Sequence, residues 1–384
     1  MSSFLRNMGG EDLRVGAFQG REIALRLARP LVTSQATMER RRVLIVVCKL
    51  CAGGADEAPV CGFGEAAPLV GWSEESVDDC LTALGTIEEA TSGMQLDEFE
   101  DVLNGLSTLP SLRFALEGAI IDGLARRRGL CLRDIFVDVD PQPVSTPDSI
   151  AVQAVIGDGD KEQTVAAVKA AIKGGAKALK LKVGVASAEE DFQRLATVRR
   201  RFPQVTLRVD ANGAWSVDEA RWFLDRVEAL NVDLVEQPVD AGKPRALLKL
   251  ARQFEVAVAA DESCTSMSAT KFLVDEGIDA VAIKPGALGG MLEVRALIKY
   301  AVARDVRVVL SSLIESAVGR RTVAELAGSC CLPGPHGLGT GEWLSEDISP
   351  DRDCIANGRL QLASTSGLGF EPVGIHLPDN KMPV

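Results

Sequence analysis

The chain has 384 residues, 46% of them hydrophobic and 25% charged, and its formal net charge is −12. This composition predicts a globular protein of two or three domains, and the negative charge argues against binding to nucleic acid or to an anionic membrane. The apolar runs all fall well short of the ~20 residues that cross a membrane. The first residues hold no apolar signal core, so we expect a cytoplasmic protein, or a plastid one if the source is a photosynthetic eukaryote.

The first part of the chain is predicted to be α+β. Strand-like runs cover residues 21–27, 42–48 and 61–67. Helical periodicity covers residues 73–85, with Ser73 as the expected N-cap, and residues 111–128. Prolines at residues 141, 143 and 147 then predict a domain boundary at residue 148.

From residue 151 the pattern changes to a regular alternation of apolar strands and amphipathic helices. Predicted strands cover residues 151–156, 178–183, 206–210, 233–236, 256–261, 280–284 and 306–311, and a shorter one lies near 337–339. Such alternation is typical of a parallel sheet, and about eight units favour a closed barrel. The predicted fold class is therefore α/β. We expect a TIM-like (β/α) barrel at residues 149–356 and an α+β capping domain at residues 1–148, to which residues 357–384 return.

Cysteine and histidine usage restricts the chemistry. The nine cysteines are scattered, and their odd number favours free thiols in a reducing compartment. Cys48 and Cys51 form a C-x-x-C without a second pair at metal-binding spacing, so core or surface thiols are the better interpretation. With only His336 and His376, a histidine-rich zinc site or a histidine-centred triad is nearly excluded. His336 is a lesser candidate for contact with substrate, and His376 is expected to be structural.

A charged residue closes most of the predicted barrel strands. Lys182, Asp210, Glu236, Asp261 and Lys284 follow one another at intervals of about 25 residues, the length of one strand, one helix and two loops. A charge at the end of an apolar strand is costly unless it is paired or bound to metal. In a barrel these strand ends meet at one mouth, where the chemistry of such folds takes place. We therefore expect the five side chains to converge.

The types of these residues suggest metal-assisted proton abstraction. Lys180 and Lys182 point to the same face of a strand, and their mutual repulsion and burial are expected to lower their pKa values toward those of a general base. Asp210, Glu236 and Asp261 offer hard oxygen ligands that suit Mg²⁺, or Mn²⁺, more than zinc. Such a cation would stabilise the charge that develops on a small carboxylate substrate. An exposed lysine pair and helix-capping acids are the alternative interpretation.

Further residues around this set are weaker candidates. Asn212 is expected beside the metal ligands, and Glu262 is expected there too or paired with a lysine. Lys284 is expected across the barrel from Lys182, so that a planar intermediate would have one amine on each face. Gly286 opens a glycine-rich segment whose N–H groups are either an anion site at a helix start or a plain turn.

The motifs Lys-Leu-Lys, Val-Asp-Ala-Asn, Val-Glu-Gln-Pro, Ala-Asp-Glu-Ser and Ile-Lys-Pro together resemble those of the enolase superfamily, muconate-lactonizing subgroup. Known members of that superfamily combine a lysine or histidine base with Mg²⁺. Segments that begin at Gly62, Pro110, Ser311 and Gly337 further resemble o-succinylbenzoate synthases of menaquinone and phylloquinone biosynthesis.

This resemblance implies the syn dehydration of 2-succinyl-6-hydroxy-2,4-cyclohexadiene-1-carboxylate to o-succinylbenzoate. It implies Lys182 as the base, which also protonates the departing hydroxide, and Lys284 as a cation over the substrate ring. It further implies that Lys180 tunes Lys182 and that Ser311 and Ser312 contact the succinyl arm.

Other activities on the same scaffold stay open. An N-succinylamino-acid racemase or a dipeptide epimerase would use the same lysines, although residues 337–342 lack the Asp-x-Asp pair by which dipeptide epimerases resemble one another. A non-catalytic metal-binding homologue is the alternative from another class, and the presence of all five strand-end charges argues against it. The resemblance also implies that the loop at residues 30–37 closes over the mouth. A homo-oligomer is compatible with the sequence.

Overall fold

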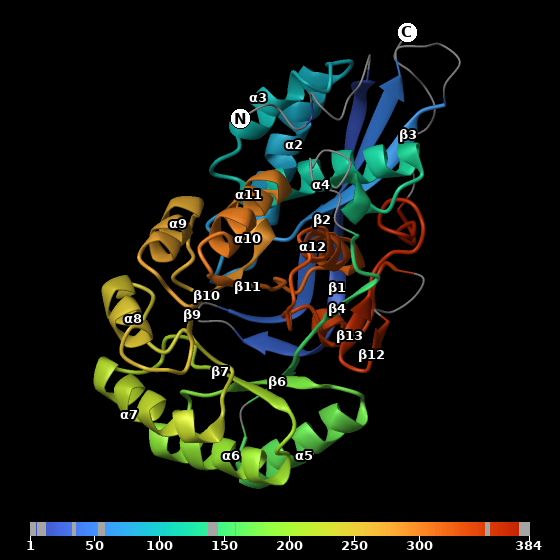
Figure 1. Ribbon diagram of the computed structural model, residues 1–384. Helices are drawn as coiled ribbons and strands as arrows, with labels where there is room; N and C mark the ends of the chain where they lie inside the picture. The colour runs from blue at the N-terminus through green and yellow to red at the C-terminus, as the bar shows by residue number, and fades with distance from the viewer. Residues whose placement is uncertain are drawn as a thin grey trace.

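The computed structural model describes residues 5, 13–32, 36–52, 58–136, 145–157, 159–349 and 354–375. Figure 1 shows an antiparallel sheet with its helices at one end of the molecule and a curled parallel sheet with outer helices at the other. All nine cysteines, including those of the C-x-x-C, are free thiols. In the described residues no helix is long and apolar enough to cross a membrane.

The antiparallel sheet has the strand order β1 (Leu13–Val32), β2 (Thr37–Ala52) and β3 (Val60–Ala66). The first two strands extend beyond their predicted bounds because they pair along nearly their whole length. Helix α4 (Pro110–Arg128) packs directly on β3. This close approach requires glycine, since a Cβ at Gly64 would lie 1.9 Å from the carbonyl oxygen of Ala115.

The helices of this part confirm one prediction and correct another. Helix α4 begins one residue before its predicted start. Helix α2 (Val77–Thr91) begins four residues later than predicted, because Ser76 and Asp79 form the capping box. Ser73 is therefore not the N-cap; its hydroxyl accepts a hydrogen bond from the Leu69 N–H. The remaining elements are α3 (Phe99–Asn104) and the 3-10 turn η1 (Leu132–Phe136).

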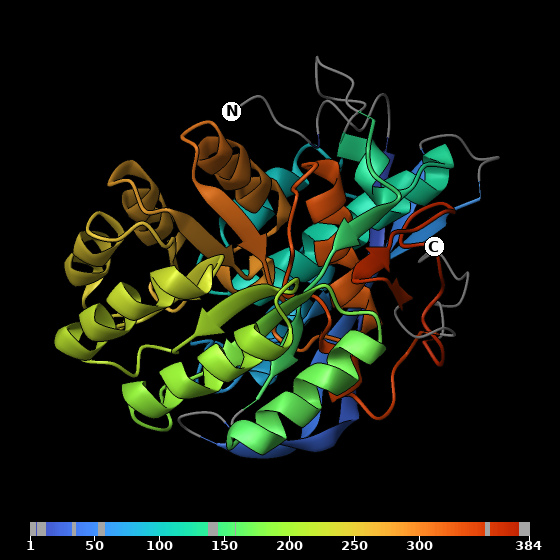
Figure 2. The same cartoon turned by 60° about the horizontal axis from the view of Figure 1, so that its bottom comes forward.

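The parallel sheet has seven strands in the order β11, β10, β9, β8, β7, β6 and β5. Their bounds are β5 (Ala154–Ile156), β6 (Ala178–Lys182), β7 (Thr206–Asp210), β8 (Leu234–Glu236), β9 (Val258–Ala260), β10 (Ala280–Ile283) and β11 (Arg307–Leu310). Figure 2 shows the sheet curling, with helices along its outer side. The α/β class is thus confirmed, in the form of a curled parallel sheet beside an antiparallel one.

Helices alternate with these strands as the sequence predicts. Their bounds are α5 (Lys161–Lys173), α6 (Ala188–Arg201), α7 (Val217–Val227) with η2 (Glu228–Leu230), α8 (Pro244–Ala251), α9 (Met267–Asp275), α10 (Pro285–Leu288), α11 (Met291–Val302) and α12 (Ala317–Ser329). Capping boxes start α5, α6 and α7 at Asp160, Ser187 and Ser216. These local signals explain why the alternation is readable in the sequence.

The two edges of the parallel sheet differ from prediction. The predicted strand at residues 151–156 is two strands, because β4 (Ser149–Ala151) pairs with β13 (Arg359–Gln361) instead of joining the parallel sheet. The predicted eighth strand is a short segment that contacts both edges: His336 bridges Val152, and Gly337 bridges Ser311. The turn η3 (Thr340–Trp343) follows it, and β12 (Ile355–Ala356) completes the β4–β13 sheet.

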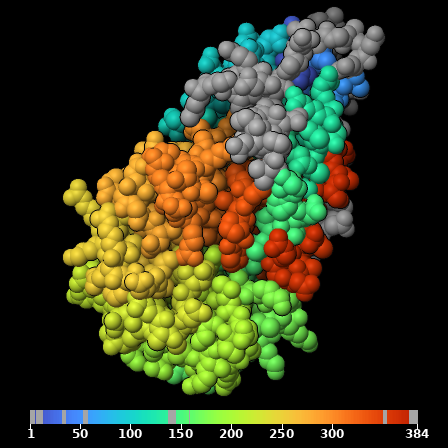
Figure 3. All heavy atoms as spheres, in the orientation of Figure 1, coloured from blue at the N-terminus to red at the C-terminus, as the bar shows by residue number. Residues whose placement is uncertain are grey.

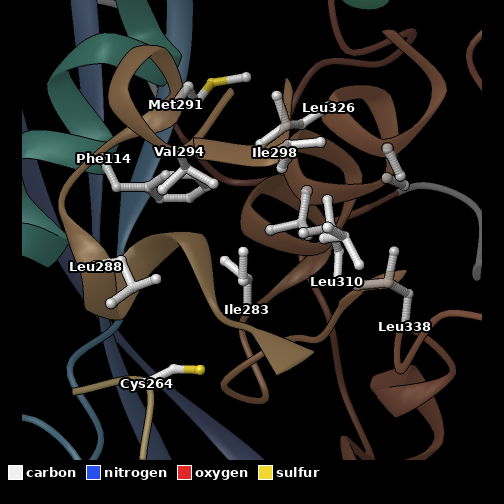
Figure 4. Packing of buried hydrophobic residues seen from close by; sticks show 14 of the residues in the cluster. Phe114, Cys264, Ile283, Leu288, Met291, Val294, Ile298, Leu310, Leu326 and Leu338 are labelled. Atoms are coloured by element: carbon white, nitrogen blue, oxygen red, sulfur yellow. The ribbon is translucent and has the colours of Figure 1, made fainter. Parts of the chain in front are cut away.

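The two parts share buried side chains. Phe114 of α4 belongs to the same buried cluster as Leu288 and Val294 from the parallel part, and Figure 4 shows these side chains from close by. The C-terminal segment also contacts the N-terminal part, since Gly367 exchanges backbone hydrogen bonds with residues 130 and 132. Figure 3 shows the C-terminal segment, in red, beside the green-blue segment that includes α4. The domain bounds at residues 148 and 356 stay a prediction.

Candidate active site

Parallel register places the charged residues side by side at the ends of the strands. Lys182 is the register partner of Asp210, and Asp210 is the partner of Glu236 on the next strand. Asp261 directly follows β9 and Lys284 directly follows β10. Because the sheet order is β6, β7, β8, β9, β10, the three carboxylates lie between the two lysines along the sheet.

The side chains make direct contacts. Lys180 Nζ lies 2.9 Å from Asp210 Oδ2 and 2.7 Å from Glu236 Oε1. Lys182 Nζ lies 2.7 Å from Asp210 Oδ2 and 2.7 Å from Asn212 Oδ1. The predicted convergence of both lysines with these carboxylates is therefore what the structure shows.

Lys284 makes its contacts on the other side of the carboxylates. Its ammonium group forms an ion pair with Asp261. It also lies over the indole ring of Trp72, with Nζ 3.7 Å from the ring centroid. Trp72 comes from the antiparallel part of the chain, so both parts contribute to this side of the site.

Burial and mutual repulsion set the electrostatics of the carboxylates. Burial and the neighbouring charge of Asp210 raise the pKa of Glu236 to about 7. Burial also raises the pKa of Asp261, against the attraction of Lys284. Asp210 behaves differently: burial favours its neutral form, but the charges of Lys180 and Lys182 outweigh burial and lower its pKa.

The predicted lowering of the Lys180 pKa is wrong in this structure. Burial does lower it, but the charges of Asp210, Glu236 and Asp261 together outweigh burial and raise the pKa of Lys180 above its usual range. The repulsion between the two lysines is weaker than the attraction of Lys180 to the three surrounding carboxylates, and that attraction determines the direction of the pKa shift. Lys180 is therefore positively charged and bridges the carboxylates of Asp210 and Glu236.

A second layer of polar residues orients the first. The Asn212 amide donates to Glu262 Oε1 at 2.8 Å. Among the described residues, Glu262 therefore pairs with this amide and not with a lysine, which was one of its two expected partners. Gln237 was missed as a site residue. Its Oε1 accepts hydrogen bonds from the Asp261 N–H at 2.9 Å and the Ser263 N–H at 3.1 Å, and it is fully buried. The only signal for Gln237 was its place in the Val-Glu-Gln-Pro motif.

The donor set fits a hard divalent cation. Three carboxylates supply only oxygen ligands, and Glu236 Oε2 is buried with no hydrogen-bond partner among the described residues. As the side chains stand, no three acidic, histidine or cysteine groups of the described chain come together as a ready metal cluster. Lys180 and Lys284 form ion pairs with these carboxylates.

Two of the three predicted substrate contacts, Ser312 and Gly286, make hydrogen bonds within the protein. The Ser312 hydroxyl hydrogen-bonds the Thr340 hydroxyl. Ser311 is buried, and a Cβ at Gly337 would lie 2.4 Å from its Oγ. The Gly286 carbonyl accepts a hydrogen bond from Ser111 Oγ at 2.9 Å.

Near Gly286, a protein carboxylate accepts a hydrogen bond at the start of α11. Leu292 N–H, in the first turn of α11, donates to Glu117 Oε2 at 2.9 Å. Glu117 belongs to α4 and is fully buried. The start of α11 is thus capped from the antiparallel part, while Gly286 itself lies in the short helix α10 and its role stays a prediction.

The remaining predicted residues lie either inside the fold or outside the described residues. His336 is fully buried and its Nδ1 accepts a hydrogen bond from the Leu310 N–H at 3.1 Å, which gives it a structural role. His376 and residues 33–35 of the expected closing loop lie outside the described residues. Strand β1, which precedes this loop, is anchored to η3, since the Arg29 guanidinium lies 4.0 Å from the centroid of the Trp343 ring.

Comparison with known families gives this site its class. The family model "Enolase C-terminal domain-like" matches residues 163–374, more than half of the chain. The chain therefore belongs to the enolase superfamily, as the resemblance of its motifs predicted.

Its relatives carry out different reactions. L-Ala-D/L-Glu epimerase of Bacillus subtilis is 28% identical over 80% of this chain and 83% of its own. An o-succinylbenzoate synthase of the same organism is 23% identical over 91% of this chain and 92% of its own. A chloromuconate cycloisomerase of Pseudomonas sp. is 27% identical over 89% and 92%.

Solved structures agree on the fold. The substrate-liganded L-Ala-D/L-Glu epimerase from Bacillus subtilis superimposes with a TM-score of 0.82 at 24% identity, covering 94% of this chain and 100% of the other. The dipeptide epimerase from Enterococcus faecalis, complexed with Mg and L-Leu-L-Tyr, gives a TM-score of 0.80 at 21% identity, covering 93% and 99%.

Proposed function

We propose that this chain is a Mg²⁺-dependent o-succinylbenzoate synthase, which dehydrates 2-succinyl-6-hydroxy-2,4-cyclohexadiene-1-carboxylate. The observation that carries the proposal is the order of charges along the sheet: Lys182, three carboxylates, then Lys284. A carboxylate substrate held at the acids would have one amine on each side. The motif segments beginning at Gly62 and Ser311 support the dehydratase in particular.

The proposal includes a closed barrel. Seven strands curl among the described residues, and residues 336 and 337 make hydrogen bonds at both edges. The Gln153 N–H, directly before β5, donates to the His336 carbonyl at 3.0 Å, and the Gly337 N–H donates to the Leu310 carbonyl of β11 at 2.8 Å. A short eighth strand at this point would close the sheet. Closure explains how Lys284, four strands from Lys182, faces the same space.

Asp210, Glu236 and Asp261 would hold the cation, with Mn²⁺ as a substitute for Mg²⁺. Bound there, it supplies a positive charge that stabilises the carboxylate of the substrate as negative charge develops. It would also neutralise the acids that raise the pKa of Lys180. Lys180 would then stand as a positive charge beside Lys182, since both amines contact the Asp210 carboxylate.

Lys182 would carry out both proton transfers. Its neutral Nζ takes the proton from the carbon beside the carboxylate, and the electron pair of the broken C–H bond moves toward the carboxylate. The pair then returns to form the aromatic ring as the hydroxyl group leaves. Lys182, on the same face, gives its proton to the leaving oxygen, so that water departs. Asn212 Oδ1, 2.7 Å from Nζ, keeps the amine aimed into the site.

Racemisation or epimerisation is the second candidate. The epimerase relatives share the fold, and amines on opposite sides of a carbon suit exchange of its proton from either face. Residues 337–342 lack an Asp-x-Asp pair, which argues against dipeptides as substrates. N-succinyl amino acids stay the better substrates for this alternative.

One experiment separates these functions. The purified protein with Mg²⁺ is incubated with the cyclohexadiene acid, with N-succinyl amino acids and with dipeptides, and aromatic product or deuterium exchange is measured. We expect aromatic product, loss of it with chelator, and loss of it in Lys182→Ala while Mg²⁺ still binds. Turnover of only the succinyl amino acids or the dipeptides would refute the dehydratase.

A further inference from the structure

Trp72 connects the antiparallel part to one of the two lysines. Lys284 Nζ lies 3.7 Å from the centroid of its ring and also pairs with Asp261. An ammonium group has three N–H donors. The carboxylate and the ring face occupy two directions, which leaves one for a ligand.

We propose that Trp72 is a positioning residue that holds the ammonium group of Lys284 in one orientation toward the substrate. The proposal rests on the proposed function, since it assumes that Lys284 acts on a substrate. An indole face is the best aromatic partner for a cation, and the contact strengthens as water is excluded. The side chain of Lys284 is only 11% exposed, so this contact lies in a largely dry setting.

The turn that carries Trp72 is well built. The Trp72 N–H and the Ser73 N–H both donate to the Leu69 carbonyl, at 2.9 and 2.8 Å. Ser73 Oγ accepts from the Leu69 N–H at 3.0 Å. Gly71 between them has φ of 86°, a conformation that glycine adopts without strain. The ring is therefore presented by a rigid turn.

A buried arginine ties the start of this turn to the parallel part. Arg41 is 3% exposed, and its guanidinium donates to the Pro68 carbonyl at 2.8 Å and to the Ala67 carbonyl. The same group donates to the Leu313 carbonyl at 3.3 Å, in the loop after β11. The position of the turn is thus set from one side of Lys284.

A second connection ties the end of the turn to α10. Glu75 Oε1 accepts from the Ser111 N–H at 2.7 Å. Ser111 Oγ donates to the Gly286 carbonyl at 2.9 Å, two residues after Lys284. The turn and the lysine are therefore anchored to common neighbours, which is the arrangement expected if their separation matters.

Kinetics of Trp72 variants test this role. Trp72→Leu keeps apolar bulk and removes the π face, so kcat should fall roughly 5- to 30-fold while KM changes less than about threefold. Trp72→Phe keeps a π face and should stay within about threefold of wild type. A matched control is Trp222→Leu, which removes an outer contact in which the Arg226 guanidinium lies 4.1 Å from the ring centroid, and it should leave kcat unchanged. Full kcat in Trp72→Leu, or an equal loss in Trp72→Phe, would overturn the proposal.

Tryptophan fluorescence tests the contact without any turnover. A charge beside an indole ring shifts its emission, so Lys284→Met should change the emission spectrum of the folded protein. The same substitution in a Trp72→Phe background should leave the spectrum unchanged. Equal changes in both backgrounds, or none in either, would overturn the contact. If no offered substrate is converted while this difference is seen, the proposed function fails and the positioning contact stands.

Discussion

Glu65 gives a pH-dependent prediction that can be worked from the structure. This residue of β3 is 1% exposed, and it accepts hydrogen bonds from the Ser316 and Gly319 N–H groups, both at 2.7 Å, at the start of α12. Burial raises the pKa of Glu65 from 4.5 to about 7. The folded protein therefore holds this proton more tightly than the unfolded chain between those pH values.

The sign and size follow from proton linkage. Because the pKa is higher in the folded state, the stabilisation from the bound proton is complete below about pH 4.5 and is lost as pH rises through about 7. At about 1.36 kcal/mol per pH unit over this interval, the loss approaches roughly 3 kcal/mol. Glu65→Gln keeps the shape and has no such proton, so its free energy of unfolding should rise relative to wild type by about that amount from pH 4.5 to 8.

The assay is urea unfolding, followed by tryptophan fluorescence at pH values from 4.5 to 8. Glu39→Gln, at an exposed position of β2, is the matched control for removal of a surface carboxylate. If the difference between wild type and Glu65→Gln stays constant over this range, the carboxyl group titrates normally and the reasoning is refuted.

Three other predictions follow from single residues. Asp210→Asn should weaken Mg²⁺ binding by at least about tenfold in calorimetry, because a ligand charge is lost; unchanged affinity would exclude Asp210 as a ligand. Gly64→Ala should lower the free energy of unfolding by roughly 1–3 kcal/mol or more, because its Cβ would lie 1.9 Å from the Ala115 oxygen; unchanged urea stability would contradict this packing. Burial lowers the pKa of His336 from 6.5 to about 4. The stabilisation of the fold by the neutral imidazole is therefore complete above about pH 6.5 and is lost as pH falls through 4. His336→Asn should therefore remove a rise in stability with pH of up to roughly 3 kcal/mol, and a slope equal to wild type would contradict it.

The sequence predicts those elements whose signals are local. The strand at residues 206–210 and the helix at 111–128 match β7 and α4 closely, because apolar runs, helical spacing and caps act over a few residues. The start of α2 was misplaced because two serines compete for the cap, and the structure selects Ser76 for its reciprocal bond with Asp79. The strand at 151–156 was misplaced at its start because residues 149–151 pair with residues 359–361, and that partner is distant in sequence.

The same distinction applies to the site. The sequence alone predicted that Lys182, Asp210, Glu236, Asp261 and Lys284 lie close together, because parallel strands repeat at a regular interval and end at one edge. It did not reveal Gln237 or Trp72 as partners, since Gln237 carries no charge although it directly follows β8, and Trp72 lies in a turn of the antiparallel part.

Sequence by itself determined the order of charges along the sheet and the family to which the chain belongs. Only the tertiary structure decided which charge faces which: Lys180 between two acids, and Lys284 between Asp261 and an indole from another sheet. The physical reason is range. Strand periodicity is encoded within a few residues, whereas a contact between residues 72 and 284 depends on how two separately built parts pack together.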